Sequence, residues 1–375
     1  MQNHTAFDCA VQKMRSARPL DLSAAKWSDL QSWQKQAREC LLTGLHYHPG
    51  PVDLQAETIE TFDHGDYIRE CVRFNTAPWF RVEGWFLLPR HVPRPMPAIL
   101  LLHDWGGPMF FGKDRMYDLG DSCDLLDKFR AYAHGGRYLS ETFCRAGYAV
   151  LSIDAYHFGT RAPYGKYGIP CIDPRQLLKT YEGTAEFNVY ESRLRENLYL
   201  SLRQLQWAGT TWAGINFWDD ARCVDYLLSR PEVDGRRLGV TGLSGGGYRT
   251  NLLMALEDRL QAAASIGWMT TNDGVAEFNL AGAIGTFCLL PGVWDRMDVS
   301  DLVAMGFPKK SLVVVGQQDA LFPPAGVDES FRQIADAYRR FGHPEYLALE
   351  RPDKPHCYDC EVQQLALDWF AKWLA

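Results

Sequence analysis

The stretch Leu238–Tyr248 constrains the fold of this 375-residue chain most strongly, because it reads as a strand end, a sharp turn and a helix start. An apolar run leads into the spacing Gly242-x-Ser244-x-Gly246. A serine on such a turn has strained backbone geometry, so the residues two before and two after it must lack a Cβ atom. The serine hydroxyl then projects above the sheet, beside the free N–H groups of a helix N-terminus. The pattern predicts that Ser244 is a nucleophile.

An acid and a base follow the serine in the chain. The β-branched run Ser311–Gly316 has the length of a buried strand and leads into Asp319. A carboxylate in the loop after a parallel strand lies at the sheet edge where open α/β folds place their sites. Residues Glu345–Glu350 predict one more strand, and His356 follows it before a C-terminal amphipathic helix. We therefore predict a catalytic triad of Ser244, Asp319 and His356.

The acid and the base of this triad each have a plainer alternative. Asp319 could cap the helix expected after it, because aspartate is a common N-cap residue. Asp273, which also follows a predicted strand, is the second candidate for the acid, whereas Asp353 lies very close to the histidine in the same loop. His356 could be an ordinary histidine of a surface loop.

A second glycine-containing turn follows the predicted strand Pro97–His103 and reads Asp104-Trp105-Gly106-Gly107. A His-x-x-Gly-Gly turn at this place supplies one backbone N–H of an oxyanion hole, and the residue after the serine supplies the other. We therefore predict the N–H groups of Gly245 and Trp105 as the two donors. Trp105 could equally form a wall of the pocket, and the two roles are compatible.

Three segments resemble bacterial α/β-hydrolases of the acetyl xylan esterase and dienelactone hydrolase type: residues 221–247, 256–271 and 152–161. The chain order serine, acid, histidine is also the order of that superfamily. The resemblance runs from about residue 82 to the C-terminus. It implies an α/β-hydrolase fold, with helices on both faces of a mostly parallel sheet, and ester hydrolysis on carbohydrate or small acyl substrates. Dienelactone hydrolases use a cysteine nucleophile, so Ser244 favours the esterase branch.

Arg161 follows a predicted strand end and is expected at the mouth of the cleft. Its planar guanidinium can bind a carboxylate at two points, which would suit an oxygen-rich or acidic sugar. His157 and Trp268 would then form walls beside it, together with Trp105. The alternative for Arg161 is a salt bridge that holds its loop to the core.

The chain is long enough for one large α/β domain, with 46% apolar and 23% charged residues. Apolar residues at helical spacing over residues 20–45 predict a helix that stops near Gly44. We expect residues 1–65 to form a helical extension packed on the core and residues 66–375 to form the catalytic domain. Within the latter, residues 66–88 alternate like an antiparallel hairpin.

Two stretches without clear periodicity, Tyr156–Phe187 and Thr270–Val299, predict loop insertions above the serine. Both leave the carboxyl ends of predicted strands. Long irregular loops in a compact domain are usually lids or binding loops. They are rich in Gly, Pro and aromatic residues, so a partly aromatic cleft is expected.

Composition excludes several partners. The net charge of −7 argues against nucleic acid or an anionic membrane surface. No apolar run has the length of a membrane span, and the first residues lack a signal peptide, so we expect a cytoplasmic protein. The ten cysteines are scattered, and Cys357-x-x-Cys360 lacks the second pair that a zinc site needs. Cys357 could instead be a reactive thiol beside the base. We expect no metal or organic cofactor, and the sequence leaves the oligomeric state open.

These observations favour a carboxylic ester hydrolase that forms an acyl-enzyme on acetylated or methyl-esterified saccharides or other small esters. A serine peptidase of the prolyl-oligopeptidase type is the first alternative, although the first ~95 residues are too few for the propeller that usually gates its site. A non-catalytic binding protein with a hydrolase fold is the second.

Overall fold

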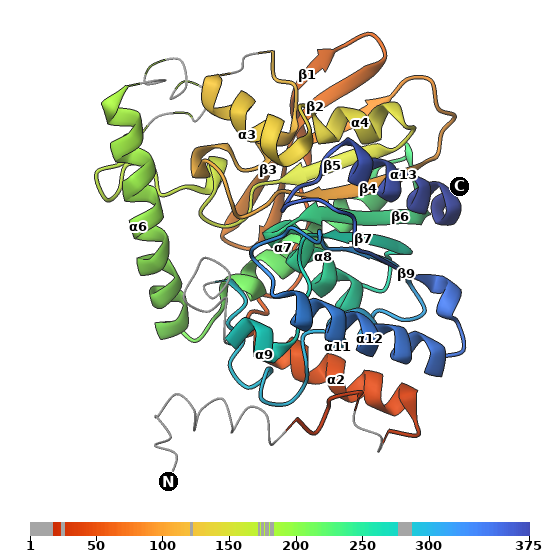
Figure 1. Ribbon diagram of the computed structural model, residues 1–375. Coiled ribbons are helices and arrows are strands. Elements are labelled where there is room, and N and C mark those ends of the chain that lie inside the picture. The colour runs from red at the N-terminus through yellow and green to blue at the C-terminus, as the bar shows by residue number, and fades with distance from the viewer. Residues whose placement is uncertain are drawn as a thin grey trace.

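The computed structural model describes residues 18–375, except 24–26, 121–122, 172, 174–175, 177–179, 181–183 and 277–286. Within this part of the chain, a nine-stranded sheet has the order β1-β2-β3-β5-β4-β6-β7-β8-β9 (Figure 1). The strands are β1 (Glu57–Asp63), β2 (Tyr67–Ala77), β3 (Phe80–Pro89), β4 (Met96–Leu102), β5 (Ala149–Ile153), β6 (Val233–Leu243), β7 (Ala262–Ile266), β8 (Lys310–Val314) and β9 (Leu347–Glu350).

The sheet is antiparallel at one end and parallel through the rest. Strands β2 and β3 form the predicted hairpin, and β1 pairs antiparallel with β2 at the edge. From β5 through β4, β6, β7 and β8 to β9, every neighbouring pair is parallel. The prediction of a mostly parallel sheet is therefore confirmed. Because parallel strands bring their carboxyl ends to one edge, the loops after β4, β6 and β8 meet there.

Helices cover both faces of the sheet, as predicted (Figure 1). Helices α3, α4 and α13 contribute apolar side chains to the core on one face, and α7 and α8 pack on the other, with α11 and α2 against α8. Helix α6 packs against the short 3₁₀ turn η1 (Met109–Phe111). The helices are α2 (Leu30–Leu45), α3 (Asp124–His134), α4 (Leu139–Arg145), α6 (Ala185–Trp207), α7 (Trp212–Ser229), α8 (Gly245–Leu256), α9 (Asn272–Gly274), α11 (Asp301–Met305), α12 (Pro324–Arg340) and α13 (Cys360–Leu374).

The N-terminal helix is present but shorter than predicted. It begins at Leu30 because the side chain of Asp29 caps it, accepting hydrogen bonds from the next two free N–H groups. Leu20, expected within the helix, lies in the non-helical segment before it and is still buried. The helix passes the predicted stop at Gly44, and His46 ends it with a left-handed backbone at φ 51°. The boundary placed at residue 65 between extension and catalytic domain stays a prediction.

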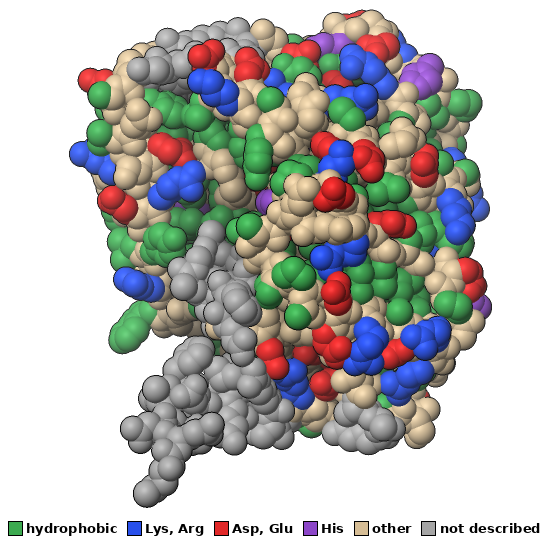
Figure 2. Space-filling view, viewed as in Figure 1, with side chains coloured by type: hydrophobic (Ala, Val, Ile, Leu, Met, Phe, Trp, Pro, Cys, Tyr) green, Lys and Arg blue, Asp and Glu red, His purple; other side chains and the backbone are tan. Residues whose placement is uncertain are grey.

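Acidic and basic side chains are interspersed over the coloured surface in Figure 2. That face carries no continuous basic stripe among its described side chains, in keeping with the net charge of −7. Among the described helices, none is both long and apolar enough to cross a membrane.

Candidate active site

Ser244 occupies the turn between β6 and α8, where its backbone has φ 57° and ψ −116°. A non-glycine residue with positive φ is uncommon and strained. The flanking glycines explain how the chain accommodates it. A Cβ atom on Gly242 would lie 2.5 Å from the carbonyl oxygen of Leu102, and one on Gly246 would overlap the same oxygen. The strand–turn–helix context predicted from the sequence is therefore present.

Asp319 and His356 come together at the carboxyl edge of the sheet. The Nδ1 atom of His356 lies 2.6 Å from Oδ2 of Asp319, whose side chain is fully buried. The other carboxylate oxygen of Asp319 accepts the N–H of Leu321 at 3.0 Å. Because a carboxylate can only accept, Nδ1 of His356 carries a proton, so in the neutral imidazole it is Nε2 that has the lone pair. This is the tautomer that a general base requires.

The two rival acids contact other groups. Asp353 accepts a hydrogen bond from Gln318 at 2.8 Å. Asp273 forms an ion pair with Arg18 at 2.8 Å and has a side chain that is 39% exposed. Of the three candidate acids, the described contacts join Asp319 to the histidine.

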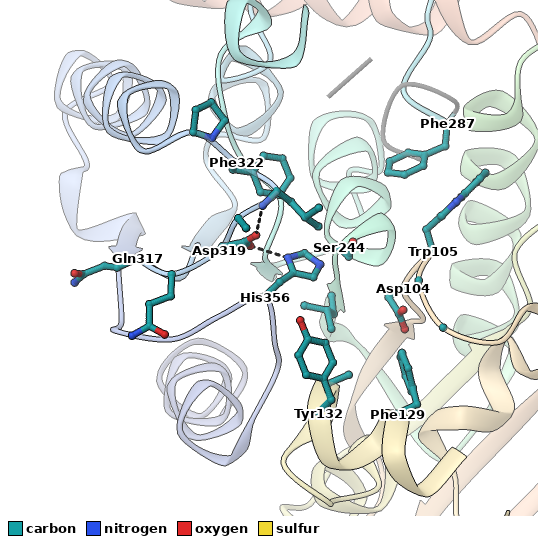
Figure 3. Close-up of a pocket in the computed structure, with 18 of the residues that line it drawn as sticks. Asp104, Trp105, Phe129, Tyr132, Ser244, Phe287, Gln317, Asp319, Phe322 and His356 are labelled. Atoms are coloured by element: carbon teal, nitrogen blue, oxygen red, sulfur yellow. Dashed lines mark hydrogen bonds and ion pairs between the residues drawn. The ribbon is translucent and has the colours of Figure 1, made fainter. Parts of the chain in front are cut away.

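A pocket of about 900 Å³ opens over this group. Figure 3 shows the ring of His356 lying between Asp319 and Ser244 on its wall. The wall is mostly apolar and aromatic, with two glutamines at one side. The described lining residues are Asp104, Trp105, Gly106, Gly107, Phe129, Tyr132, Ala133, Leu243, Ser244, Phe287, Gln317, Gln318, Asp319, Ala320, Leu321, Phe322, Pro323, Pro324 and His356.

The two predicted oxyanion donors are adjacent. The backbone nitrogen of Trp105 lies 3.0 Å from the point that a Cβ atom on Gly245 would occupy. Gly245 is the first residue of α8, so its N–H has no partner within the helix. Trp105 lines the pocket, and Gly245 directly follows Ser244, which also lines it.

His103 orients the peptide that carries the Trp105 N–H, a role that the sequence did not suggest. Its Nε2 accepts the N–H of Ala155 at 2.8 Å, so Nδ1 carries the proton and donates to the carbonyl of Asp104 at 2.7 Å. Burial lowers the pKa of His103 well below its usual range, which keeps it neutral. The Asp104 carbonyl and the Trp105 N–H point in opposite directions within one planar peptide, so fixing the first fixes the second.

The three residues predicted to bind substrate lie outside the described pocket wall. Arg161 forms a buried ion pair with Asp219 at 2.6 Å, which matches the salt-bridge alternative. His157 is buried, contacts the Leu194 carbonyl at 3.2 Å, and has its pKa lowered by burial to about 4. Trp268 is fully buried. No described contact brings Arg161 or His157 to the pocket wall, whereas Trp268 packs edge-on against Phe322 of that wall, with ring centroids 6.1 Å apart. The binding role of all three residues stays a prediction.

Of the two predicted loop insertions, Thr270–Val299 reaches the pocket through Phe287, although its residues 277–286 lie outside the described part. The described residues of Tyr156–Phe187 do not line the pocket.

Cys357 is buried, which raises the pKa of its thiol and disfavours the reactive thiolate. The described residues contain no group of three or more His, Cys, Asp or Glu side chains that could hold a metal ion.

Comparison with known proteins identifies the fold. Residues 205–375 match the model of the prolyl oligopeptidase family. The chain is 23% identical to "Putative hydrolase YtaP" of Bacillus subtilis (strain 168) over 326 residues, covering 86% of this chain and 93% of that protein. The chain has the α/β-hydrolase fold. The resemblance inferred from the sequence is confirmed at this level.

Three solved structures share the fold. A "putative acetyl xylan esterase" from Bacteroides fragilis NCTC 9343 superposes with a TM-score of 0.68 at 17% identity, over 92% of this chain and 82% of that one. A glucuronoyl esterase from Solibacter usitatus gives 0.64 at 16% identity, over 95% and 96%. Acetyl xylan esterase 1 from Thermoanaerobacterium sp. JW/SL YS485 gives 0.52 at 18% identity, over 96% and 98%.

Proposed function

We propose that the protein is a serine carboxylic ester hydrolase. The observation that carries the proposal is the 2.6 Å contact between His356 and Asp319 on the wall of the pocket that also contains Ser244. The strained turn beneath the serine and the two adjacent backbone donors support the same conclusion. The chemistry needs neither a metal nor an organic cofactor.

The reaction would run through an acyl-enzyme. Ser244 Oγ attacks the ester carbonyl while His356 Nε2 takes its proton, and the oxyanion forms beside the N–H groups of Gly245 and Trp105. His356 returns the proton to the leaving alcohol and then activates a water that hydrolyses the acyl-enzyme. Asp319 holds the imidazole tautomer and stabilises the imidazolium.

We further propose acetylated or methyl-esterified saccharides, or other small esters, as substrates. The aromatic wall contributed by Trp105, Phe129, Phe287 and Phe322 suits sugar rings, whose apolar faces stack on such side chains. Carbohydrate esterases among the structures that share the fold support this class. A screen of purified protein against acetyl, methyl and feruloyl sugar esters tests it, and turnover of simple esters alone would contradict the saccharide assignment.

A peptidase activity is the second candidate, because the C-terminal part of the chain matches the prolyl oligopeptidase family. Parallel assays on peptide nitroanilides and acetyl esters separate the two activities. A binding protein without catalysis is tested by a fluorophosphonate probe, which labels an activated serine and leaves an inert one unmodified. Stoichiometric labelling at Ser244 with hydrolysis of acetyl esters and not of peptides is the expected result.

A further inference from the structure

The loop that presents the Trp105 N–H wraps around one buried guanidinium. Arg115 comes from the 3₁₀ turn η2 (Lys113–Met116) and has no exposed surface. Its Nε donates to the carbonyl of Phe111 at 2.6 Å and its Nη2 to that of Pro108 at 2.8 Å. Its Nη1 donates to the carbonyl of Gly106 and, at 3.0 Å, to the carboxylate of Asp104. One side chain therefore binds four acceptors of the segment 104–111.

Only arginine can make this set of bonds. Its planar group holds five N–H donors in a fixed fork, whereas the lysine ammonium is a compact charge with three donors at one point. The ring of Phe129 lies 5.0 Å from the centre of the guanidinium and closes the space around it. Buried carbonyl groups need partners, and this guanidinium supplies them where the loop has little regular structure of its own.

The backbone on either side of Trp105 is thus bound by two different side chains. His103 binds the carbonyl of Asp104, on the near side of the Trp105 nitrogen, and Arg115 binds the next carbonyl but one, that of Gly106. Gly107 follows, with a left-handed backbone at φ 70°. A hole of backbone donors accelerates a reaction only when the donors already face the developing charge.

We infer that Arg115 is a positioning residue for the oxyanion hole: it holds the loop so that the Trp105 N–H stays directed at the carbonyl oxygen of the substrate. The inference rests on the proposed esterase function and assigns the residue no contact with substrate. It differs from a purely structural role because it predicts a loss of transition-state stabilisation in enzyme that is still folded.

Arg115→Lys is the direct test, with Arg222→Lys as the matched control. Arg222 is also buried and also binds a carboxylate and a backbone carbonyl, but outside the pocket wall. The amount of competent enzyme is first fixed by end-point titration with a fluorophosphonate. We expect kcat of Arg115→Lys for p-nitrophenyl acetate to fall by about 10²-fold with KM changed less than about threefold. The control should keep kcat within about threefold per titrated site.

Inhibitor affinities separate a positioning role from a purely structural one, because only a positioning role predicts weaker binding of a transition-state analogue alone. A trifluoromethyl ketone forms a tetrahedral adduct with an oxyanion, and its affinity should fall in parallel with kcat. A non-hydrolysable ground-state analogue should bind Arg115→Lys as it binds the wild type. Equal loss for both ligands, or unchanged kcat in folded protein, would overturn the inference.

Because Arg115→Lys can fail to fold, a variant of the loop itself provides the second test. A Cβ atom on Gly107 would lie 2.5 Å from the ring of Phe129 and 3.0 Å from Nη1 of Arg115, so Gly107→Ala forces the loop and these two side chains to shift relative to one another. Gly65→Ala is its control, because Gly65 has the same backbone strain at φ 84° and open space around it. We expect kcat to fall in Gly107→Ala with little change in KM, and both constants to be unchanged in Gly65→Ala. A higher KM at unchanged kcat would mean that the added methyl group only narrows the pocket, which contradicts the inference.

Failure of this inference is distinguishable from failure of the proposed function. If wild-type Ser244 does not react with the probe and no ester is hydrolysed, the proposed function is wrong. If the wild type is active while folded Arg115→Lys and Gly107→Ala keep its kcat, the function stands and the positioning role is wrong.

Discussion

The backbone nitrogen of Trp105 lies 3.0 Å from the place where Gly245 would carry a Cβ atom. The first residue of α8 must therefore be glycine if the loop after β4 is to bring its donor against the helix N-terminus. We predict that Gly245→Ala pushes the two donors apart and lowers kcat by about 10²–10³-fold, the usual effect of losing one oxyanion donor. Steady-state kinetics on p-nitrophenyl acetate measure it. A variant with raised KM and normal kcat would show that the donors are placed elsewhere.

Ser244→Ala removes the proposed nucleophile. The turn keeps its flanking glycines, and alanine tolerates the positive φ no worse than serine does, so the fold should persist. We expect hydrolysis of p-nitrophenyl acetate to fall by several orders of magnitude and fluorophosphonate labelling to disappear. Turnover near that of the wild type would contradict the mechanism.

Asp319→Asn tests the acid. An asparagine there can present its amide N–H to the imidazole and so stabilise the wrong tautomer, and we expect kcat to fall by roughly 10⁴-fold. Asp273→Asn is the control, because Asp273 pairs with Arg18 and does not line the described pocket, and kcat of this variant should change little. The reverse pattern would transfer the acid to the loop after β7.

Arg161→Ala should act on stability. The change leaves the carboxylate of Asp219 buried at 2% exposure without its cation, which typically costs about 3–5 kcal/mol in free energy of unfolding. Urea denaturation measures this loss. Arg236→Ala, at an ion pair whose arginine is 91% exposed, should leave the free energy of unfolding nearly unchanged. A selective rise in KM for sugar esters, with normal stability, would instead support the role predicted from the sequence.

Stability should also depend on a buried histidine. Burial lowers the pKa of His134 to about 3, with the charges of Arg115 and Arg130 adding to the effect. In the unfolded chain the imidazole takes up a proton near pH 6.5, whereas in the folded protein it does so only near pH 3. The contribution of His134 to the free energy of unfolding is therefore complete above pH 6.5 and is lost as the pH falls toward 3. Between those limits the loss approaches about 1.4 kcal/mol per pH unit. His134→Gln should flatten the decline measured by urea denaturation between pH 7 and pH 4.5, whereas His343→Gln, at the surface, should not.

Strands and turns that are marked by a short local sequence pattern could be predicted from the sequence. A short apolar run marks the end of β6, a β-branched run marks β8, and the glycines around Ser244 mark the turn between strand and helix. Chain order then places Asp319 and His356 at the same sheet edge, because parallel strands end there. The edge strand β1 escaped prediction, since its side chains are almost all exposed and lack the alternation of a half-buried strand.

Contacts between distant segments are what the sequence leaves open. Arg161 and Asp219 are 58 residues apart, and nothing near either residue reveals the other. The role of Arg115 depends on three backbone carbonyls, which every residue possesses and no motif records. Helix α2 begins at Leu30 because Asp29 is its N-cap. Several polar residues nearby could have served as the cap, and the sequence alone does not distinguish them.

The pairing of Leu102 with Gly242 joins β4 to β6 in the middle of the sheet. It also joins two portions of the chain that supply different parts of the proposed reaction centre. The proposed oxyanion donor Trp105 precedes the exposed turn at Gly209, and the three side chains of the proposed triad follow it. A chain divided at that turn would regain turnover only when its two fragments reassemble. Such a pair of fragments has the layout of a complementation reporter. With a different binding partner fused to each fragment, the rate at which a chromogenic ester is hydrolysed would measure how much of the two partners is associated.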